Sequence, residues 1–240
     1  MYDSDDEYAS SPKNKCENLA DSPLRAAEGY VTASADAGRS CDGSGKKFSA
    51  TFKALLCWGE EVNFIRPEAD FQFFKRQPDG FGDEHQAWFD EQTGRWFKAT
   101  YRDRFGLAWG RNGTATVREY LTRLILQNTY FGDDIALVAL VNSDGKLRVL
   151  ISQRHIAGEP AAYEEIQHWI RFLGFCRLES RGCIAWYLPS NNLLMADAHE
   201  GNVIRTARNV LVPIDLNLIQ PNGNLYHAII AEMPRRMLMA

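Results

Sequence analysis

The sequence predicts an α+β fold, because strand and helix patterns alternate along most of the chain. Two β-rich stretches each contain a turn with glycine, and a segment with helical spacing separates them. A further amphipathic segment is followed by short apolar runs and turns up to about residue 220. With 240 residues, of which 45% are hydrophobic, the chain can bury a sizeable core, as one large domain or as two small lobes.

Composition and charge argue against several kinds of partner. The 27 basic and 31 acidic residues give a formal net charge of −4, which would not steer a nucleic acid or an anionic membrane onto the protein. No apolar run approaches the roughly eighteen residues of a membrane-spanning helix, and the polar, acidic N-terminus lacks the pattern of a signal peptide. We therefore predict a cytoplasmic protein that binds neither nucleic acid nor a membrane.

The first 48 residues differ in composition from the rest of the chain. They are rich in Ser, Asp and Gly and contain few large apolar residues. Such a segment buries too little apolar surface to offset the entropy that it loses on ordering. We therefore predict that residues 1–48 form a disordered tail, although a start codon assigned too far upstream would give the same pattern.

The folded part is predicted to begin with a helix and a hairpin. From Phe48 to about residue 65, apolar residues recur near helical spacing. After Pro67 the pattern turns to strands, and residues 85–101 contain two β-rich runs around a turn that ends at Gly94. The order at the start of the folded part is therefore helix, then hairpin.

A second helix and a second hairpin are predicted next. Residues 117–131 carry apolar side chains at 3.6-residue intervals, with Thr116 as a suitable N-cap and Gly132 beyond the end. The hairpin that follows would turn at Asp144 and Gly145. A third amphipathic helix, ending near Gly174, then leads into short strands and turns.

The segment MADAHEGNVI places Asp197, His199 and Asn202 within six residues, between two apolar runs. Two further short apolar runs after Asn202, joined by a four-residue turn, predict a tight hairpin that returns Asp215 to Asn202. Oxygen atoms of these two residues suit a hard ion such as Mg²⁺, and Asp197 would be free to orient or deprotonate a hydroxyl. The competing interpretation is that Asp197, Asn202 and Asp215 cap loops and form Asx turns.

The spacing of these three residues resembles the catalytic segment of the protein-kinase-like superfamily, in which an Asp precedes an Asn by five residues and a later Asp chelates the metal. The form DAHEGN looks more like the antibiotic- and small-molecule-kinase branch than like the H-R-D form of the eukaryotic enzymes. Over roughly residues 50–222, the sequence is most similar to the Ser/Thr/Tyr kinase-like domains found in polyvalent proteins of phages and conjugative elements.

The resemblance implies a compact two-lobed kinase-like fold. Residues 49–155 would form a sheet-rich N-lobe, and residues 156–240 a reduced C-lobe that carries the catalytic segment. Only 25 residues follow Asp215, so the large helical region that binds peptides in protein kinases would be absent. The implied activity is phosphoryl transfer from ATP, with Mg²⁺, to a hydroxyl acceptor that is either a small molecule or a protein Ser, Thr or Tyr.

The resemblance also assigns roles in the N-terminal half. Lys98 in RWFKAT would contact the nucleotide phosphates, and Glu119 on the following helix would hold it by an ion pair. Gly80 and Gly82 in DGFGDEH would lie in a loop that covers the phosphates, and residues 151–159 would connect the lobes beside the adenine. These residues also have plain structural interpretations. Lys98 could be an exposed strand lysine, Glu119 could be a solvated helix residue, and Gly80 and Gly82 could form an ordinary turn.

In the C-terminal half, Asp197 and Asn202 would be catalytic together with Lys98, and Asn202 and Asp215 would bind Mg²⁺. Two other functions remain open. Because no Arg precedes Asp197 and no Phe-Gly follows Asp215, the chain could be a pseudokinase that binds nucleotide without turnover. Alternatively, Asp197, His199 and Asp215 could ligate the ion of a metal-dependent hydrolase. In the kinase interpretation, His199 would fix the loop by hydrogen bonds.

Overall fold

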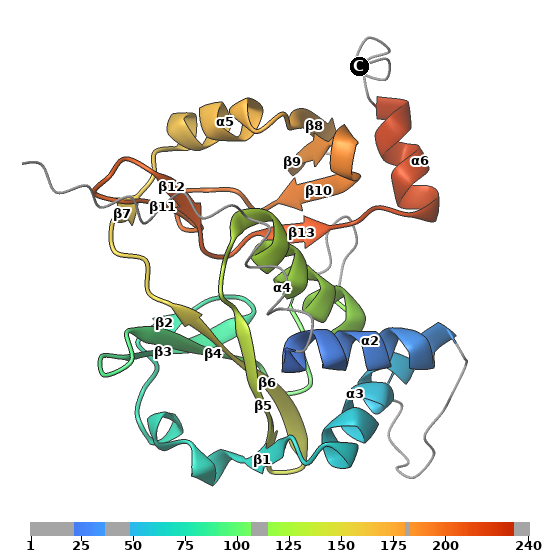
Figure 1. Ribbon diagram of the computed structural model, residues 1–240, viewed down its shortest axis with the longest axis vertical. Coiled ribbons are helices and arrows are strands. Elements are labelled where there is room, and N and C mark those ends of the chain that lie inside the picture. The colour runs from blue at the N-terminus through green and yellow to red at the C-terminus, as the bar shows by residue number, and fades with distance from the viewer. Residues whose placement is uncertain (1–21, 37–48, 107–114, 181–182, 233–240) are drawn as a thin grey trace, which may run out of the picture.

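A computed structural model describes residues 22–36, 49–106, 115–180 and 183–232 of the protein, which has a mixed α/β architecture (Figure 1). These residues form three β-sheets and five α-helices. The mixture of helices and sheets expected from the sequence is therefore confirmed. No helix in the described ranges is both long enough and apolar enough to cross a membrane.

The largest sheet has six strands in the order β1-β5-β6-β4-β3-β2. Neighbouring strands are antiparallel, except β1 and β5, which run parallel. The bounds of its strands are β1 (Ile65–Pro67), β2 (Gly80–Phe81), β3 (His85–Asp90), β4 (Arg95–Thr100), β5 (Ala136–Ser143) and β6 (Lys146–Arg154). Both predicted hairpins are present, as β3–β4 and β5–β6, and Gly94, Asp144 and Gly145 adopt positive φ in their turns.

Three helices pack on one face of this sheet: α2 (Pro23–Asp36), α3 (Ala50–Glu61) and α4 (Val117–Phe131) (Figure 1). Leu55 of α3 and Leu121 of α4 are fully buried and share an apolar core with Leu140 of β5. Thr116 caps α4, and the helix ends before Gly132, which is in the left-handed conformation. Helices α3 and α4 therefore lie where the apolar spacing predicts them.

Helix α2 lies within the segment that we expected to be disordered, so the prediction of a disordered tail over residues 1–48 is wrong there. Residues 1–21 and 37–48 lie outside the described residues. The side chains that α2 buries, each at most 1% exposed, pack in the same core as α3 and α4: Leu24, Ala27 and Val31. Their spacing of three and four residues gives the helix one apolar stripe, which is too narrow to stand out in a polar, Ser- and Ala-rich segment.

The C-terminal half contains two smaller sheets and two helices. The four-stranded sheet has the order β13-β10-β9-β8, and the three-stranded sheet has the order β12-β11-β7. Helix α5 (Tyr163–Phe172) lies where the sequence predicts it, whereas α6 (Gly223–Glu232) lies beyond the last predicted element. The strands are β7 (Glu159–Pro160), β8 (Cys176–Ser180), β9 (Cys183–Leu188), β10 (Leu193–Ala196), β11 (Val203–Arg205), β12 (Leu211–Pro213) and β13 (Asn217–Ile219).

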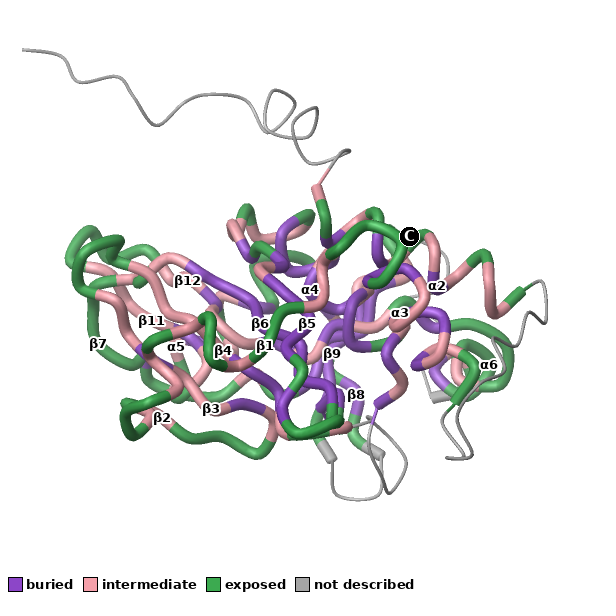
Figure 2. Tube along the Cα trace, turned by 90° about the horizontal axis from the view of Figure 1, so that it is seen from below, coloured by how far each residue is buried: buried purple, intermediate pink, exposed green. Residues whose placement is uncertain are grey.

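Helix α4 contributes to the cores of both halves. Tyr120 and Leu121 belong to the core of the six-stranded sheet, whereas Leu126 packs with α5 and the four-stranded sheet beside Met195 and Leu216. Figure 2 shows buried residues gathered around β5 and β6 in the middle of the molecule, and exposed residues around β7 at one end. The two halves therefore share one central helix as a packing surface.

Candidate active site

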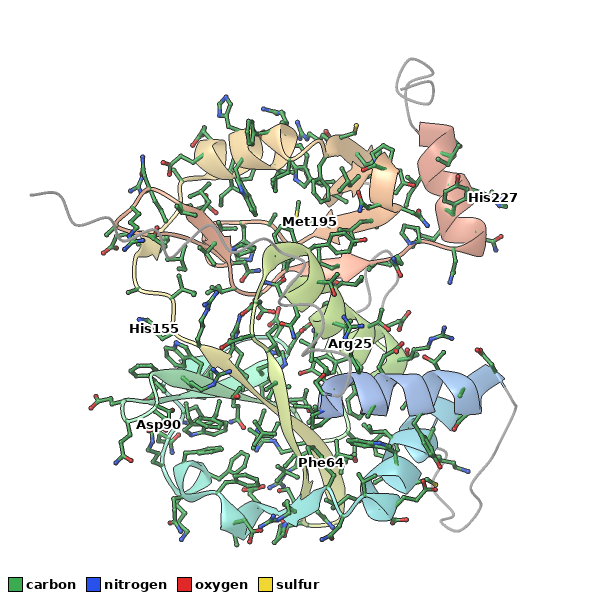
Figure 3. The ribbon with its side chains drawn as sticks, viewed as in Figure 1. Arg25, Phe64, Asp90, His155, Met195 and His227 are labelled. Carbon is green, nitrogen blue, oxygen red and sulfur yellow. The ribbon has the colours of Figure 1, made fainter. Side chains whose placement is uncertain are left out.

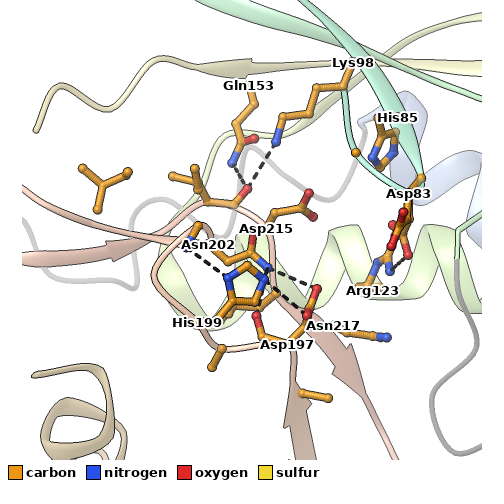
Figure 4. Close-up of a pocket in the computed structure, with 18 of the residues that line it drawn as sticks. Asp83, His85, Lys98, Arg123, Gln153, Asp197, His199, Asn202, Asp215 and Asn217 are labelled. Carbon is orange, nitrogen blue, oxygen red and sulfur yellow. Dashed lines mark hydrogen bonds and ion pairs between the residues drawn. The ribbon is translucent and has the colours of Figure 1, made fainter. Parts of the chain in front are cut away.

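A large cavity lies between the six-stranded sheet and the two smaller sheets, and its volume is about 1670 Å³. It is lined by the turn after β2, by β4, by one side chain of α4, and by the segments that follow β10 and β12 (Figure 4). All but one of the predicted site residues line this cavity: Gly80, Gly82, Lys98, Asp197, Asn202 and Asp215. The structure therefore brings together residues that are up to 135 positions apart in the sequence, and Glu119 is the exception.

The loop from Asp197 to Asn202 is held by its own polar side chains. Asp197 follows β10 directly and has a φ of 63°, a conformation that costs energy for a residue other than glycine. The Asn202 Nδ2 amide donates to the backbone oxygen of Asp197 at 2.9 Å and to its Oδ2 at 3.1 Å. The amide therefore fixes both the backbone of the turn and the direction of the Asp197 carboxylate, which is 61% exposed.

His199 fills the inside of this loop. Its Nδ1 accepts a hydrogen bond from the backbone N–H of Gly201 at 3.0 Å, and its Nε2 lies 3.2 Å from Asn202 Nδ2 and 3.5 Å from Asp197 Oδ1. A Cβ on residue 201 would approach the imidazole to 2.9 Å, so the ring needs a glycine there. These contacts agree with the predicted role of His199 as a residue that fixes the loop.

The hairpin β11–β12 returns the chain to this loop, as its sequence predicts. Val203 pairs with Pro213, and the Ile214 N–H donates to the backbone oxygen of Asn202 at 2.9 Å. Asp215 is the next residue, so it comes to lie beside Asn202 (Figure 4). The predicted proximity of Asn202 and Asp215 is thus a consequence of strand register.

Polar side chains from the six-stranded sheet and α4 anchor the backbone just before Asp215. The Ile214 carbonyl accepts hydrogen bonds from Lys98 Nζ at 3.4 Å and from Gln153 Nε2 at 3.0 Å. The Pro213 carbonyl accepts one from Gln127 Nε2 at 3.0 Å. The position of Asp215 is therefore set by side chains of the six-stranded sheet and of α4. The two glutamines carry no local sequence signal, because their partners are backbone atoms distant in sequence.

Asp197 and Asp215 differ in their electrostatic surroundings. Burial alone would raise the pKa of Asp215, but the positive charges of Lys98 and Arg123, and that of His85 once it is protonated at low pH, outweigh burial and hold this pKa below its usual value. Partial burial raises the pKa of Asp197, the neighbouring Asp215 charge adds to this, and His199 opposes it. Asp215 therefore keeps its negative charge, as a metal ligand requires, whereas Asp197 binds a proton more readily, as a base requires.

The predicted ion pair between Lys98 and Glu119 is wrong. Glu119 is exposed in the first turn of α4, where its Oε2 accepts a hydrogen bond from the backbone N–H of Thr116 at 2.7 Å. Thr116 Oγ1 in turn accepts one from Glu119 N at 3.2 Å, which completes a capping box. The pattern Thr-x-x-Glu at the start of a helix is the sequence signal that favours this role.

The side chain that α4 does send into the cavity is Arg123. Its guanidinium binds Glu84, on the turn before β3, through both nitrogens: Nη1 lies 2.8 Å from Oε1, and Nη2 binds Oε2. The Arg123 and Glu84 side chains are only 6% and 15% exposed. Next to them, His85 Nε2 lies 2.9 Å from Tyr120 Oη, and both rings are buried. The sequence did not predict this cluster, because Glu84 and Arg123 are 39 positions apart and come together only in the folded protein.

The two ends of the cavity differ in their lining. At one end, the chain leaves the six-stranded sheet at His155, directly after β6 (Figure 3). The His155 Nδ1 accepts a hydrogen bond from Trp96 Nε1 of the neighbouring strand β4 at 3.1 Å. Gly80 and Gly82 lie along the same side, and a Cβ at either position would meet nothing closer than 3.8 Å. These glycines are therefore not required by packing, which leaves space above the lysine for a ligand. At the other end, the lining comes from β8, β9 and α6.

Asn202 and Asp215 carry the donor atoms that suit Mg²⁺. Among the described His, Cys, Asp and Glu residues, no group of three or more is placed to hold a metal ion. Mg²⁺ commonly binds through one or two protein ligands, with waters and substrate phosphates completing its shell. One amide oxygen and one carboxylate beside Lys98 therefore fit an ion that arrives with a polyphosphate better than an ion that the protein holds alone.

Comparison with known proteins gives one family. The family model described as Serine/Threonine/Tyrosine Kinase found in polyvalent proteins matches residues 64–219, which include the six-stranded sheet, α4 and the whole 197–215 segment. No curated protein and no solved structure matches the chain.

Proposed function

The chain belongs to the family of Ser/Thr/Tyr kinases found in polyvalent proteins, and on this basis we propose that it transfers the γ-phosphoryl group of ATP, with Mg²⁺, to a hydroxyl acceptor. The observation that carries the proposal is the convergence of Lys98, Asp197, Asn202 and Asp215 on one cavity. Phosphoryl transfer depends on charge neutralisation and in-line positioning, which such a set of residues can supply.

We assign the architecture accordingly. Of the described residues, those from 49 to 155, together with α2, are the N-lobe, and those from 156 to 232 are a reduced C-lobe with the catalytic segment. The cavity is the cleft between them, and α4 is the helix that packs against both. The connection after β6, where His155 and Trp96 meet, is where we place the adenine, because the flat rings and the end of β6 leave an open, partly apolar edge.

Lys98 binds the nucleotide phosphates. Its ammonium already lies beside Asp215, held at 3.4 Å from the Ile214 carbonyl, so it is directed into the cavity from the strand below Gly80 and Gly82. The open space at these two glycines lets a phosphate come close to the backbone of this segment. The segment from residue 80 to 82 therefore covers the phosphates from one side, and Lys98 neutralises them from the other.

Asn202 and Asp215 hold Mg²⁺. The ion would neutralise charge on the phosphates during transfer. Asp215 supplies the full negative charge, because Lys98 and Arg123 keep its carboxylate ionised. Asn202 has a second task, since its Nδ2 orients the Asp197 carboxylate while its amide oxygen is the metal ligand.

Asp197 orients the acceptor hydroxyl and receives its proton. It follows β10 at the edge of the cavity, and the Asn202 Nδ2 amide orients its carboxylate by a hydrogen bond of 3.1 Å to Oδ2. The hydrolase alternative is less well supported, because His199 Nδ1 is already occupied by the Gly201 N–H and its Nε2 lies against Asn202. An imidazole held in this way serves the loop better than a metal.

A thermal-shift assay with ATP and ADP, with and without Mg²⁺, tests the proposal. A ligand that binds only the folded state at 100 times its Kd stabilises it by about 2.7 kcal/mol, so ATP with Mg²⁺ should raise Tm clearly and ATP alone should raise it less. Lys98→Met should reduce the shift, and Lys75→Met, at an exposed position outside the cavity, should not. Absence of any nucleotide-dependent shift would refute the proposal, and a shift without formation of ADP would identify a pseudokinase.

A further inference from the structure

A second pocket, of about 390 Å³, lies on the face of the six-stranded sheet that turns away from the proposed active site. Side chains alternate along a strand, so Gln86 and Trp88 of β3 line this pocket, whereas His85 and Ala87 line the large cavity. No residue in the described ranges lines both. Figure 1 shows the chain from β1 to β2 running below strands β2 to β4, with the two smaller sheets above them. We call this site the arginine pocket, defined by Glu68, Phe74, Gln86, Trp88, Arg102 and Arg148.

Arg148 of β6 is the buried charge of the arginine pocket. The residue is 5% exposed, and its guanidinium lies 4.9 Å from the ring centroid of Phe74 and 5.8 Å from that of Trp88. Its Nε donates to the Thr100 carbonyl at 2.8 Å, and its Nη2 donates to Gln86 Oε1 at 2.7 Å. Both acceptors are neutral, and no described residue accepts a hydrogen bond from Nη1 or forms an ion pair with Arg148. The guanidinium therefore lacks a counter-ion, which the two rings offset only in part.

Arg102 brings a second guanidinium to the same pocket. Its Nη2 lies 4.0 Å from Glu68 Oε2 and 3.7 Å from Asp144 Oδ2, and both distances exceed those of a hydrogen bond. Burial lowers the pKa of Arg148, the Glu68 charge opposes this effect, and the Arg102 charge adds to it. The two arginines are therefore close enough to repel each other, and an anion between them would relieve the repulsion.

Glu68 supplies a carboxylate to the lining of the arginine pocket. Its Oε2 is buried and accepts no hydrogen bond from any residue that the structure describes. A buried carboxylate oxygen without a donor is unfavourable. A simple anion would also be repelled by this carboxylate. The ligand that satisfies the whole pocket therefore carries an N–H donor for Glu68 in addition to negative oxygens for the arginines.

The charges of the pocket indicate which anion fits. Arg76 also lines it but is already matched, because its Nη1 lies 2.7 and 2.8 Å from the two carboxylate oxygens of Asp79. Two guanidiniums and the Glu68 carboxylate remain, and a phosphate dianion with one ammonium group neutralises this set. A carboxylate in place of the phosphate would leave one positive charge uncompensated. Guanidinium groups also match the geometry of phosphate oxygens, and a volume of about 390 Å³ suits a small molecule.

We propose that the arginine pocket binds a small phosphate monoester that carries an ammonium group, with the phosphate at Arg102 and Arg148 Nη1 and the ammonium at Glu68 Oε2. The site is separate from the proposed active site, and the inference does not depend on the proposed function. A purely structural role of Arg148 explains its bonds to Thr100 and Gln86. It leaves Nη1 and the buried oxygen of Glu68 unexplained.

Two phosphates that differ in a single ammonium group test the proposal. 2-Aminoethyl phosphate and ethyl phosphate are titrated into the full chain without ATP, and binding is measured by line broadening in ³¹P NMR. The parent protein should bind 2-aminoethyl phosphate about tenfold more tightly, because only this ligand donates to Glu68. Glu68→Gln should remove this preference. Equal binding of the two ligands by the parent, no binding of either, or an unchanged preference in Glu68→Gln would overturn the proposal.

Variants of three basic residues locate the bound phosphate. Arg102→Gln changes a side chain that is 46% exposed, so the protein should still fold, and it should weaken binding of both ligands at least about tenfold. Arg177→Gln, at a 40% exposed side chain outside both pockets, should bind them as the parent does. Lys98→Met removes the phosphate ligand proposed for the active site and should also leave binding unchanged. Binding that is lost in Lys98→Met but kept in Arg102→Gln would place the phosphate in the large cavity and overturn the proposal.

The same titration with β-alanine tests the choice of phosphate over carboxylate. This compound has the ammonium group but only one negative charge, so the parent should bind it more weakly than 2-aminoethyl phosphate. Tighter binding of β-alanine would overturn the phosphate assignment.

Discussion

Glu84 and Arg123 form the least exposed of the described ion pairs, and they connect the turn beside Gly82 to helix α4. Removing one partner of a buried pair leaves an uncompensated charge. Arg123→Met should therefore lower the free energy of unfolding by roughly 3–5 kcal/mol, as measured by urea denaturation. Arg66→Met removes a pair that is 57% and 34% exposed and should cost less than about 1 kcal/mol. Similar losses in the two variants would contradict the buried pair.

His85 makes stability depend on pH. Burial lowers its pKa to about 4, whereas an unfolded His has a pKa near 6.5. Between these values the unfolded chain binds a proton that the folded protein does not, so stability falls as pH decreases from about 6.5 to 4, by up to roughly 3 kcal/mol. His85→Gln should flatten this decrease in urea denaturation curves between pH 7 and 4.5. His168→Gln, at an exposed helix position, should not change it, and a parallel decrease in His85→Gln would exclude His85 as its source.

The partner of a single side chain was the least predictable feature of the site. The sequence places an acidic and a basic residue, Glu119 and Arg123, one turn apart on α4. Which of them faces the cavity depends on how the whole helix is rotated against two cores, and no local pattern contains that information. Asp197, Asn202 and Asp215 were easier to place, because a short hairpin fixes their proximity within 19 residues.

At the scale of elements, local signals predicted those that carry their own boundaries. The hairpin β3–β4 has its turn glycine, and α4 has both an N-cap at Thr116 and a glycine at its end. Helices α2 and α6 lack such signals. Helix α2 contains a glycine and several polar residues, and the first residue of α6 is a glycine. Each of these helices is stabilised because its few buried side chains pack in an apolar core formed with other elements. Such packing depends on the tertiary fold and cannot be predicted from the local sequence.

The contribution of α2 can be measured directly. Leu24 is 1% exposed in the core that α3 and α4 share, so Leu24→Ala should lower the free energy of unfolding by roughly 2–5 kcal/mol. Ala33→Ser, at an exposed position of the same helix, should change it by less than about 0.5 kcal/mol. Chemical denaturation of both variants gives the comparison. If Leu24→Ala cost no more than Ala33→Ser, α2 would not be part of the folded core.

At the scale of the whole molecule, the proposed active site is assembled from both halves. Lys98 and Gln153 of the six-stranded sheet and Gln127 of α4 hold the backbone that presents Asp215, and Asn202 on the other side of the cavity orients Asp197. A cleft built in this way positions a nucleotide and an acceptor only when the two halves are docked. The fold therefore links stability of the interface around α4 to the chemistry that we propose.

The central claim is that Asp215 holds a metal and Asp197 receives a proton. The measurement that tests it most directly is Mg²⁺-dependent ATP affinity, together with the single-turnover rate, for Asp215→Asn and Asp197→Asn. Asp215→Asn should need far more Mg²⁺ and lose metal-dependent nucleotide binding. Asp197→Asn should keep ATP affinity near that of the parent protein while the rate falls by about 10²-fold or more. Equal loss of ATP binding in both variants would instead indicate a hydrolase-like metal cluster. If neither variant lost ATP affinity or rate, these residues would serve only to cap loops.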